Sequence, residues 1–258
     1  MSFTPETLKD FLEEKYLLYN RPSFIEQDPI SIPHLFSRKE DIEISAFLTA
    51  TISWGQRPSI LKNAHRLMEL MDMAPHDFIM NAKSDDTKRF RQFVHRTFNG
   101  IDCIYFLKSL QNIYQKHQGL EKVFQSGFGK DATDTGKAIS HFRSIFFELS
   151  HPARTEKHVS EPSRNSAAKR INMYLRWMIR QDEMGVDFGL WKIISPSKLC
   201  CPLDLHSGSV ARKLGLLERK QDDWKAVCEL TGNLRRFDPS DPVKYDLALF
   251  SLGVYEHF

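Results

Sequence analysis

Lys169 has the residue type and the setting that nucleophilic chemistry requires. It lies in the first turn of the segment 166–180, SAAKRINMYLRWMIR, whose apolar residues recur at helical spacing. The positive end of a helix dipole and the neighbouring Arg170 both disfavour a protonated amine there. A neutral lysine amine can attack a sugar C1′ or form a Schiff base. The alternative is an ordinary exposed lysine on a solvated helix face.

Asp204 is a second chemically suggestive residue, in the segment CPLDLHS. The proline-led extended stretch brings Asp204 and His206 to an expected helix start. An aspartate before a helix commonly caps it by accepting backbone N–H hydrogen bonds. A carboxylate held in this way can also stabilise positive charge and move protons if it faces a cleft. The two roles are compatible, and the sequence leaves both open.

A local excess of positive charge surrounds Lys169. The segment 151–181 has seven Lys and Arg against two Glu, whereas the whole chain has a net charge of only +3. On a helical projection of 166–180, one face is apolar and the opposite face carries cations. Such a stripe suits a phosphate backbone, although a solvated helix face has the same pattern. The candidate phosphate contacts are Arg164, Arg170, Arg176 and Arg180.

The motif SWGQR, residues 53–57, separates two expected helices. Ser37 and Glu40 form a capping-box pattern before the first helix, Gly55 breaks it, and Pro58 starts the next one. We therefore expect a tight turn between two helices. A further motif, FVHRTFNG at 93–100, ends in a glycine typical of a helix stop, and we expect it to pin one helix to the next.

Metal and cofactor chemistry receives little support. The four cysteines are too few and too irregularly spaced for a disulfide framework, and no CxxC pair is present. Cys200, Cys201, Asp204 and His206 could be combined into a metal site, but adjacent cysteines point in divergent directions and no second ligand pair is evident. We expect no metal and no cofactor.

The elements that must position these residues are helices. The 258 residues are 41% hydrophobic and 27% charged, which is typical of a globular protein, and apolar residues recur every three or four positions. The apolar stretches are too short to span a membrane, and the acidic N-terminal segment lacks the pattern of a secretory signal. We expect an all-α cytoplasmic protein, as a monomer, with no membrane association.

Two helical lobes are expected. The first is a central domain over residues 40–182, with the SWGQR turn and the Lys169 helix. The second is a discontinuous domain of residues 1–39 and 183–258 that carries Asp204. A cleft between the two lobes would hold the functional site.

The pairing of AAKRINMYLRWM with CPLDLHS resembles the helix-hairpin-helix base-excision DNA glycosylases. In that family a lysine early in a helix is followed by a loop that ends in a proline-hydrophobic-aspartate-hydrophobic-histidine run. The resemblance implies a two-lobed glycosylase-like architecture with a central cleft. It also implies that Lys169 is the catalytic lysine, that Asp204 is the catalytic aspartate, and that His206 approaches DNA phosphate.

The resemblance extends to other segments. AFLTATISWGQRPSI, residues 46–60, looks like the family's helix, polar turn and helix, which implies wedge or pocket roles for Trp54, Gln56 and Arg57. SWGQR, FVHRTFNG, AAKRINMYLRWMIR, VDFGLW, PLDLHS and RKLGL together resemble a bacterial family of conserved hypothetical proteins with a domain of unknown function.

The chain departs from the glycosylases in several respects. The glycosylase hairpin before the lysine is glycine-rich, whereas EPSRNSAAKR has Asn165 in this region. The spacing from Lys169 to Asp204 is longer than in most of the family and is similar to that of an archaeal oxoguanine-specific branch. The insertion VDFGLWKIISPSK is expected to line a pocket. The cysteines cannot supply the C-terminal iron–sulfur cluster of many relatives.

The expected function is therefore DNA-repair N-glycosylase, with or without an AP-lyase step, acting on a lesion in double-stranded DNA. The damaged base would flip into a pocket near Trp54 and Trp191. Lys169 would attack C1′, and Asp204 would stabilise the cationic sugar and help to move protons. Two alternatives stay open: a non-catalytic nucleic-acid-binding module on the same scaffold, and an enzyme with a small-molecule or RNA substrate.

Overall fold

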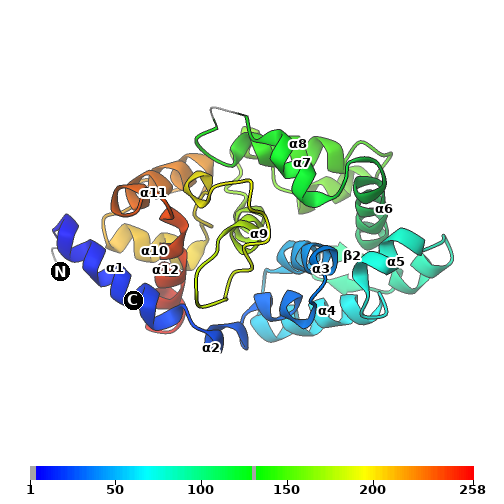
Figure 1. Ribbon diagram of the computed structural model, residues 1–258, viewed down its shortest axis with the longest axis horizontal. Helices are drawn as coiled ribbons and strands as arrows, with labels where there is room; N and C mark the ends of the chain where they lie inside the picture. Colours follow the sequence, from blue (N-terminus) through cyan, green and yellow to red (C-terminus); the bar gives the residue numbers. More distant parts are fainter. Residues whose placement is uncertain (1–3, 130–131) are drawn as a thin grey trace. The chain divides into compact units, whose positions relative to one another are not determined.

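The chain is mostly helical (Figure 1). The computed structural model describes residues 4–129 and 132–258. Within them the strands are β1 (Val94–His95) and β2 (Phe98–Asn99), which pair as an antiparallel hairpin. The α-helices are α1 (Pro5–Tyr19), α2 (Pro22–Ile25), α3 (Lys39–Ile52), α4 (Arg57–Glu69), α5 (Pro75–Asn81), α6 (Gly100–Lys116), α7 (Leu120–Gly127), α8 (Gly136–Phe146), α9 (Lys169–Ile179), α10 (Leu205–Lys213), α11 (Trp224–Phe237) and α12 (Tyr245–Val254). The predicted all-α class is confirmed.

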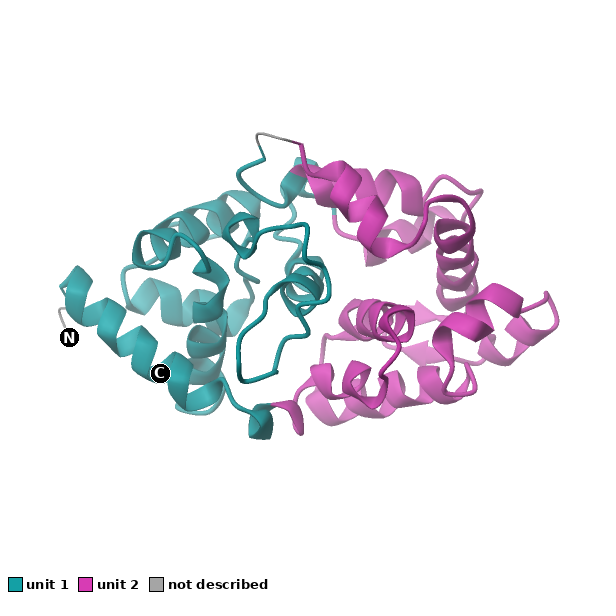
Figure 2. Ribbon diagram, viewed as in Figure 1, with its two compact units in different colours: residues 1–24, 130–136, 161–258 teal, residues 25–129, 137–160 magenta. Residues whose placement is uncertain are grey.

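The chain divides into two compact units, coloured separately in Figure 2. Unit 1 consists of residues 1–24, 130–136 and 161–258, and unit 2 consists of residues 25–129 and 137–160. These ranges differ from the expected domains in two respects. Residues 25–39 belong to unit 2 rather than to the lobe of the chain ends. The Lys169 helix, α9, belongs with the chain ends and with Asp204 rather than with the central segment, because its buried arginines pair with carboxylates from the C-terminal part of the chain.

Unit 1 is built around α12, whose sequence YDLALFSLGV is apolar on nearly every side. A helix with this composition is stable only when other elements surround it. Helices α1 and α10 both pack against α12. Leu8 and Leu12 of α1 join residues of α10, α11 and α12 in one hydrophobic core.

Unit 2 is centred on α3, whose residues 42–52 are all buried. The Phe47 ring of α3 lies 5.9 Å from the Phe106 ring and 5.4 Å from the Phe142 ring, centroid to centroid. The turn after α3 is tight, as predicted, with Gly55 at φ +104°. The predicted capping box before α3 is wrong, because Arg38 occupies the cap position without a side-chain cap, and its guanidinium binds Glu40.

The FVHRTFNG motif forms the β1–β2 hairpin and the start of α6. Asn99 caps α6 through a capping box with Asp102. Gly100 is the first residue of α6 rather than the stop of an earlier helix. A Cβ atom on Gly100 would lie 2.3 Å from the carbonyl oxygen of Arg91, so only glycine fits. The motif does join two segments, as expected, but through this close backbone approach.

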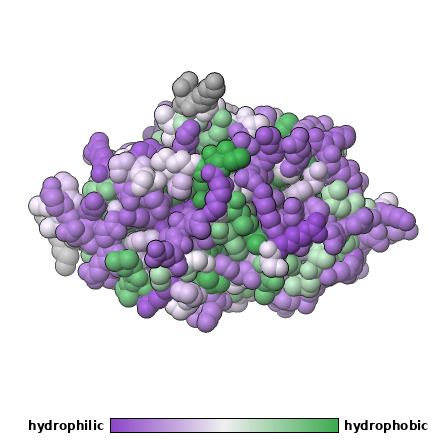
Figure 3. Space-filling view, viewed as in Figure 1, coloured by the Kyte–Doolittle hydropathy of each residue, from purple (hydrophilic) through white to green (hydrophobic). Residues whose placement is uncertain are grey.

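Over the described ranges 4–129 and 132–258, we find no helix long and apolar enough to cross a membrane. Most side chains on the face shown in Figure 3 are hydrophilic.

Candidate active site of Lys169 and Asp204

Lys169 is the first residue of α9, and a strained turn presents it. Asn165 has φ +64° and Ala168, the residue just before α9, has φ +47°, so both adopt the left-handed conformation. Asparagine tolerates this conformation better than most residues, whereas in alanine it costs on the order of 1 kcal/mol. Asn165 therefore supplies the backbone geometry for which a glycine would be expected. Its side-chain amide donates to Asp223 at 2.9 Å and anchors the turn.

Asp204 caps α10, as the sequence suggested. Its Oδ1 accepts hydrogen bonds from the backbone N–H groups of His206 at 2.9 Å and Ser207 at 3.0 Å. In return, the Ser207 hydroxyl accepts from the Asp204 backbone N–H at 3.0 Å, which completes a capping box. The cap occupies Oδ1 and leaves the other carboxylate oxygen, Oδ2, to face another partner.

That partner is Lys169. The Lys169 Nζ lies 3.5 Å from Asp204 Oδ2, and the two side chains are 27% and 23% exposed. The sequence left open whether Asp204 caps a helix or faces a reactive group, and the carboxylate does both. Because both residues belong to unit 1, this distance lies within one compact unit. The pair is therefore a lysine amine and a fixed carboxylate that are within reach of solvent.

The electrostatic setting keeps Asp204 ionised. Burial by itself would raise the pKa of Asp204, but the charge of Lys169 and the hydrogen bond from the Ser207 backbone hold that pKa below its usual value. The backbone dipoles at the start of α10 act in the same direction. Asp204 is therefore a carboxylate throughout the neutral pH range.

A second carboxyl group, Asp246 of α12, adjoins this site and was missed by the sequence analysis. One oxygen pairs with Arg176 of α9, and the other lies 3.9 Å from the Cys201 thiol. Burial raises the pKa of Asp246 to about 6, an effect that Arg176 opposes and Asp204 reinforces. The available signal was a single acidic residue inside the apolar stretch YDLALF, since a charged residue is rarely buried without a partner.

The expectation that Arg176 and Arg180 contact phosphate is wrong. Their exposed fractions are 4% and 1%. Arg176 Nε lies 3.2 Å from Asp187, whereas Arg180 Nη1 lies 3.0 Å from Asp187 and its Nε lies 2.8 Å from Asp241. The helical projection identified a polar face correctly, but carboxylates rather than solvent cover that face. These arginines anchor α9.

Trp191 is also a structural residue rather than a pocket wall. Its side chain is fully buried, and its ring meets that of Tyr174 edge-to-face, with centroids 5.5 Å apart. A ring enclosed in this way offers no face to an incoming base, so the expected pocket role is wrong. The stretch around Trp191 looked irregular in sequence, and burial could not be inferred from periodicity.

The other cationic candidates remain accessible to different degrees. Arg164, before the strained turn, and His206, in the first turn of α10, are exposed. Arg170 is half-buried, and burial lowers its pKa to about 10, so it stays charged at neutral pH. All three flank Lys169 or Asp204 in sequence and stay predicted nucleic-acid contacts.

The residues of the SWGQR turn belong to unit 2, whereas Lys169 and Asp204 belong to unit 1. Gln56 is exposed, and Trp54 and Arg57 are half-buried. Arg57 is the first residue of α4. Their wedge or pocket roles stay predictions.

No group of three or more His, Cys, Asp and Glu side chains that could hold a metal ion is found within residues 4–129 and 132–258. Cys200 and Cys201 are buried, and burial raises the pKa of the Cys200 thiol to about 11. A thiol with such a pKa is a poor nucleophile and a poor metal ligand at neutral pH.

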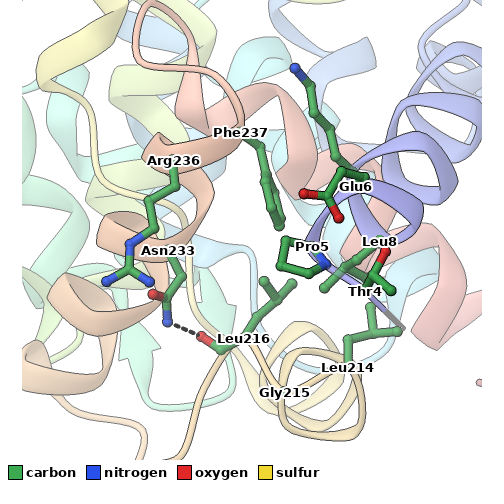
Figure 4. Close-up of a pocket in the computed structure, with 11 residues that line it drawn as sticks. Thr4, Pro5, Glu6, Leu8, Leu214, Gly215, Leu216, Asn233, Arg236 and Phe237 are labelled. Atoms are coloured by element: carbon green, nitrogen blue, oxygen red, sulfur yellow. Dashed lines mark hydrogen bonds between the residues drawn. The ribbon is translucent and has the colours of Figure 1, made fainter. Parts of the chain in front are cut away.

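A cavity in unit 1 is separate from the Lys169–Asp204 pair, because neither residue lines it. It has a volume of about 590 Å³ and lies among α1, α11 and the residues that follow α10 (Figure 4). Its wall includes Leu8, Phe237 and Leu216, whose carbonyl accepts a hydrogen bond from Asn233 at 2.9 Å. The charged residues that line this cavity, Glu6, Lys9 and Arg236, are all exposed.

Comparison with known proteins gives a single result. No curated protein and no solved structure matches the chain. A family model with the description "Protein of unknown function (DUF2400)" matches residues 28–255, which include Lys169, Asp204 and Asp246. The chain therefore belongs to the DUF2400 family.

Proposed function

We propose that the protein is a DNA-repair N-glycosylase in which Lys169 is the nucleophile and Asp204 is its electrostatic and proton-transfer partner. The observation that carries the proposal is the 3.5 Å separation of Lys169 Nζ and Asp204 Oδ2, with both side chains partly open to solvent. A nucleophile and a proton acceptor at this distance form the minimum arrangement for covalent catalysis.

The proposed chemistry begins with transfer of a proton from the Lys169 ammonium to the Asp204 carboxylate, which frees the lone pair of the amine. The lone pair of the neutral Lys169 amine attacks C1′ while the bond between C1′ and the base nitrogen breaks. The base leaves with that electron pair and takes up the proton held by Asp204, and the regenerated Asp204 carboxylate stabilises the positive charge on the sugar. Asp204 then accepts a proton from the nitrogen of Lys169. The nitrogen lone pair then breaks the bond between C1′ and the ring oxygen, and the ring oxygen takes the proton from Asp204. The product is a protonated Schiff base between Nζ and C1′, which is the intermediate for an AP-lyase step.

The capping box supports the catalytic role of Asp204. Three donors hold Oδ1: the backbone N–H groups of His206 and Ser207, and the Ser207 hydroxyl at 3.2 Å. The carboxylate therefore needs no rearrangement when positive charge develops in front of Oδ2. Such preorganisation is a major source of transition-state stabilisation in enzymes.

The start of α9 supports a nucleic-acid substrate. Ala168 provides no side-chain cap, so the first backbone N–H groups of α9 are suited to bind a phosphate oxygen. Arg164 lies just before this turn and is exposed. In this proposal the strained turn at 165–168 serves as the hairpin of the glycosylase-like architecture.

Borohydride trapping tests the proposal. Wild-type protein is mixed with duplexes that carry an abasic site or one of a series of damaged bases, and sodium borohydride reduces any Schiff base to a stable crosslink. We expect a crosslink with wild type and none with Lys169→Gln. Lys62→Gln, which alters an exposed lysine of α4, is the matched control and should crosslink normally. A crosslink that persists in Lys169→Gln would remove Lys169 from the assigned role.

A non-catalytic nucleic-acid-binding module is the second candidate. The observation that favours it is that Lys169 and Asp204 already form an ion pair that can simply hold α9 against α10. In that case Lys169→Gln and Asp204→Asn would bind duplex DNA with wild-type affinity and salt dependence, and no lesion would be cleaved. Tight binding of a nucleoside without affinity for duplex DNA would instead indicate a small-molecule substrate.

A further inference from the structure

Two motifs that are distant in sequence meet in unit 2 and form a cavity. The SWGQR turn lies against the β1–β2 hairpin of FVHRTFNG, which the sequence analysis treated as structural. The cavity has a volume of about 360 Å³ and is lined by Trp54, Gln56, Ser59, Asn63, Val94, His95 and Arg96. This volume is near the lower end of the range for small-ligand pockets, roughly 300 to 1,000 Å³.

His95 fixes the wall of this cavity. Its Nε2 donates to the backbone carbonyl of Trp54 at 3.1 Å, and its Nδ1 accepts from the Asn63 side-chain amide at 2.9 Å. The imidazole is buried, and its ring lies edge-to-face with the Trp54 ring, with centroids 6.1 Å apart. The turn, the hairpin and α4 are therefore joined by one side chain, which makes the cavity preformed.

Arg96 occupies a backbone position that usually excludes arginine. It lies in the two-residue loop between β1 and β2 with φ +55°, where hairpins favour glycine, asparagine or aspartate. Gly55 faces it, and a Cβ on Gly55 would lie 3.1 Å from Arg96 Cδ. Strain retained in this way is commonly associated with a functional side chain.

The Arg96 side chain is exposed, and its guanidinium lies 4.9 Å from the centroid of the Trp54 ring. Within residues 4–129 and 132–258 it has no carboxylate partner, and no acidic residue lines the cavity. A cation without a counter-charge, beside a preformed cavity, favours an anionic ligand. The guanidinium over the ring also shows that one face of Trp54 accepts a flat group.

The remaining groups at the cavity add hydrogen-bonding capacity. The Trp54 Nε1 donor is buried and has no partner among the described residues, which is unusual in a folded protein. Gln56 is exposed at the rim, and its amide can both donate and accept. A ligand with a flat ring and a negative charge could stack on Trp54, pair with Arg96 and exchange hydrogen bonds with Gln56.

We propose that this cavity binds one unpaired nucleotide, with its base stacked on Trp54 and its phosphate paired with Arg96. On binding, the guanidinium moves off the ring and onto the phosphate, and the base takes its place. The inference rests on the proposed function in one respect, which is that the ligand is nucleic acid. It adds a binding site in unit 2 and assigns Arg96, His95 and Asn63 to it.

The test measures binding of a short oligothymidylate to the full chain by intrinsic tryptophan fluorescence and by anisotropy of a labelled strand. We expect the strand to quench wild-type fluorescence and Trp54→Phe to lose that quenching. Stacking on an aromatic side chain contributes about 1–3 kcal/mol per base, so Trp54→Ala should weaken binding on the order of 5- to 150-fold. Thymidine monophosphate, used as a second probe, distinguishes a free nucleotide from a strand.

Arg96→Gln provides an independent arm, because it alters an exposed side chain and leaves the core intact. We expect it to weaken binding and to reduce the slope of log affinity against log salt by about 0.7, the value for one phosphate on a single strand. Arg66→Gln, at another exposed arginine of unit 2, is the matched control. It should keep the wild-type affinity and the wild-type slope of log affinity against log salt.

The outcomes separate this inference from the proposed function. Wild-type affinity and salt slope in both Trp54→Ala and Arg96→Gln would overturn the inference, as would the absence of Trp54-dependent quenching with either probe. If neither wild type nor any variant forms a borohydride crosslink, but Trp54-dependent quenching is observed, the glycosylase chemistry is overturned and the nucleotide site is supported.

Discussion

Asp204 has two roles, as the cap of α10 and as the negative charge that faces Lys169, and two substitutions can separate their effects. Asparagine caps helices about as well as aspartate, so Asp204→Asn should keep the hydrogen bonds from His206 and Ser207 and lose only the negative charge facing Lys169. Asp204→Ala should lose both. The first variant therefore isolates the charge, and the difference between the two variants isolates the cap.

The magnitudes follow from the geometry. Loss of an N-cap costs about 0.5–2 kcal/mol. The Lys169–Asp204 pair is partly exposed, at 27% and 23%, so screening by solvent limits its contribution to roughly 1 kcal/mol or less. We expect Asp204→Ala to lower the free energy of unfolding by about 1–2 kcal/mol, which corresponds to roughly 2–8 °C in Tm for a chain of this size. Asp204→Asn should shift Tm by less than half as much.

Thermal unfolding followed by circular dichroism, together with borohydride trapping, provides the assay. Both variants should lose crosslinking, whereas only Asp204→Ala should lose substantial stability. Thr4→Ala, which removes the capping box of α1 in the same unit, should lower Tm but crosslink normally. Equal destabilisation by the two Asp204 variants would refute the capping assignment, and crosslinking by Asp204→Asn at the wild-type rate would refute the catalytic one.

Three further predictions concern buried groups of unit 1. Arg180→Met should lower the free energy of unfolding by about 3–5 kcal/mol in urea, because it leaves one oxygen of the buried Asp187 carboxylate and the Asp241 carboxylate without their shared guanidinium partner. An unchanged urea midpoint would contradict the buried ion-pair network. Burial raises the pKa of Asp246 to about 6, so the folded state binds its proton more tightly than the unfolded chain does. The stability gained from this protonation is complete below about pH 4 and is lost as the pH rises through 6. Wild type should therefore lose stability relative to Asp246→Asn between pH 4 and 6, and a constant difference in unfolding free energy would argue against this assignment. Trp191→Ala should lower the free energy of unfolding by about 3–5 kcal/mol, because it removes a large buried side chain. A Trp191→Ala protein that keeps its stability but loses DNA affinity would show that Trp191 contacts DNA.

Features encoded by neighbouring residues were predictable from the sequence. The helical class follows from apolar periodicity, the tight turn at Gly55 follows from a glycine and a proline near each other, and the cap at Asp204 follows from a short polar residue before a helix. Each depends on contacts over three or four positions, so the pattern is visible in a single stretch of chain. The hydrogen bonds of the Asp204 cap also fix which carboxylate oxygen remains free, but the sequence does not say what that oxygen meets.

The surroundings of each helix were decided by the tertiary structure alone. Arg176 and Arg180 lie on the polar face that periodicity predicts, yet Asp187, Asp241 and Asp246 enclose that face. Periodicity distinguishes an apolar face from a polar one, but it does not show whether water or a distant carboxylate covers the polar face, because that depends on which other elements pack there.

The same reason explains the two sites. The sequence determined that Lys169 starts a helix and that Asp204 caps another, whereas their 3.5 Å separation depends on the packing of unit 1. Likewise, Trp54 and Arg96 were each visible in a motif, but only the folded chain brings the guanidinium over the ring. Local backbone preferences act within a few residues, while the approach of groups that are distant in sequence is set by burial of the whole core.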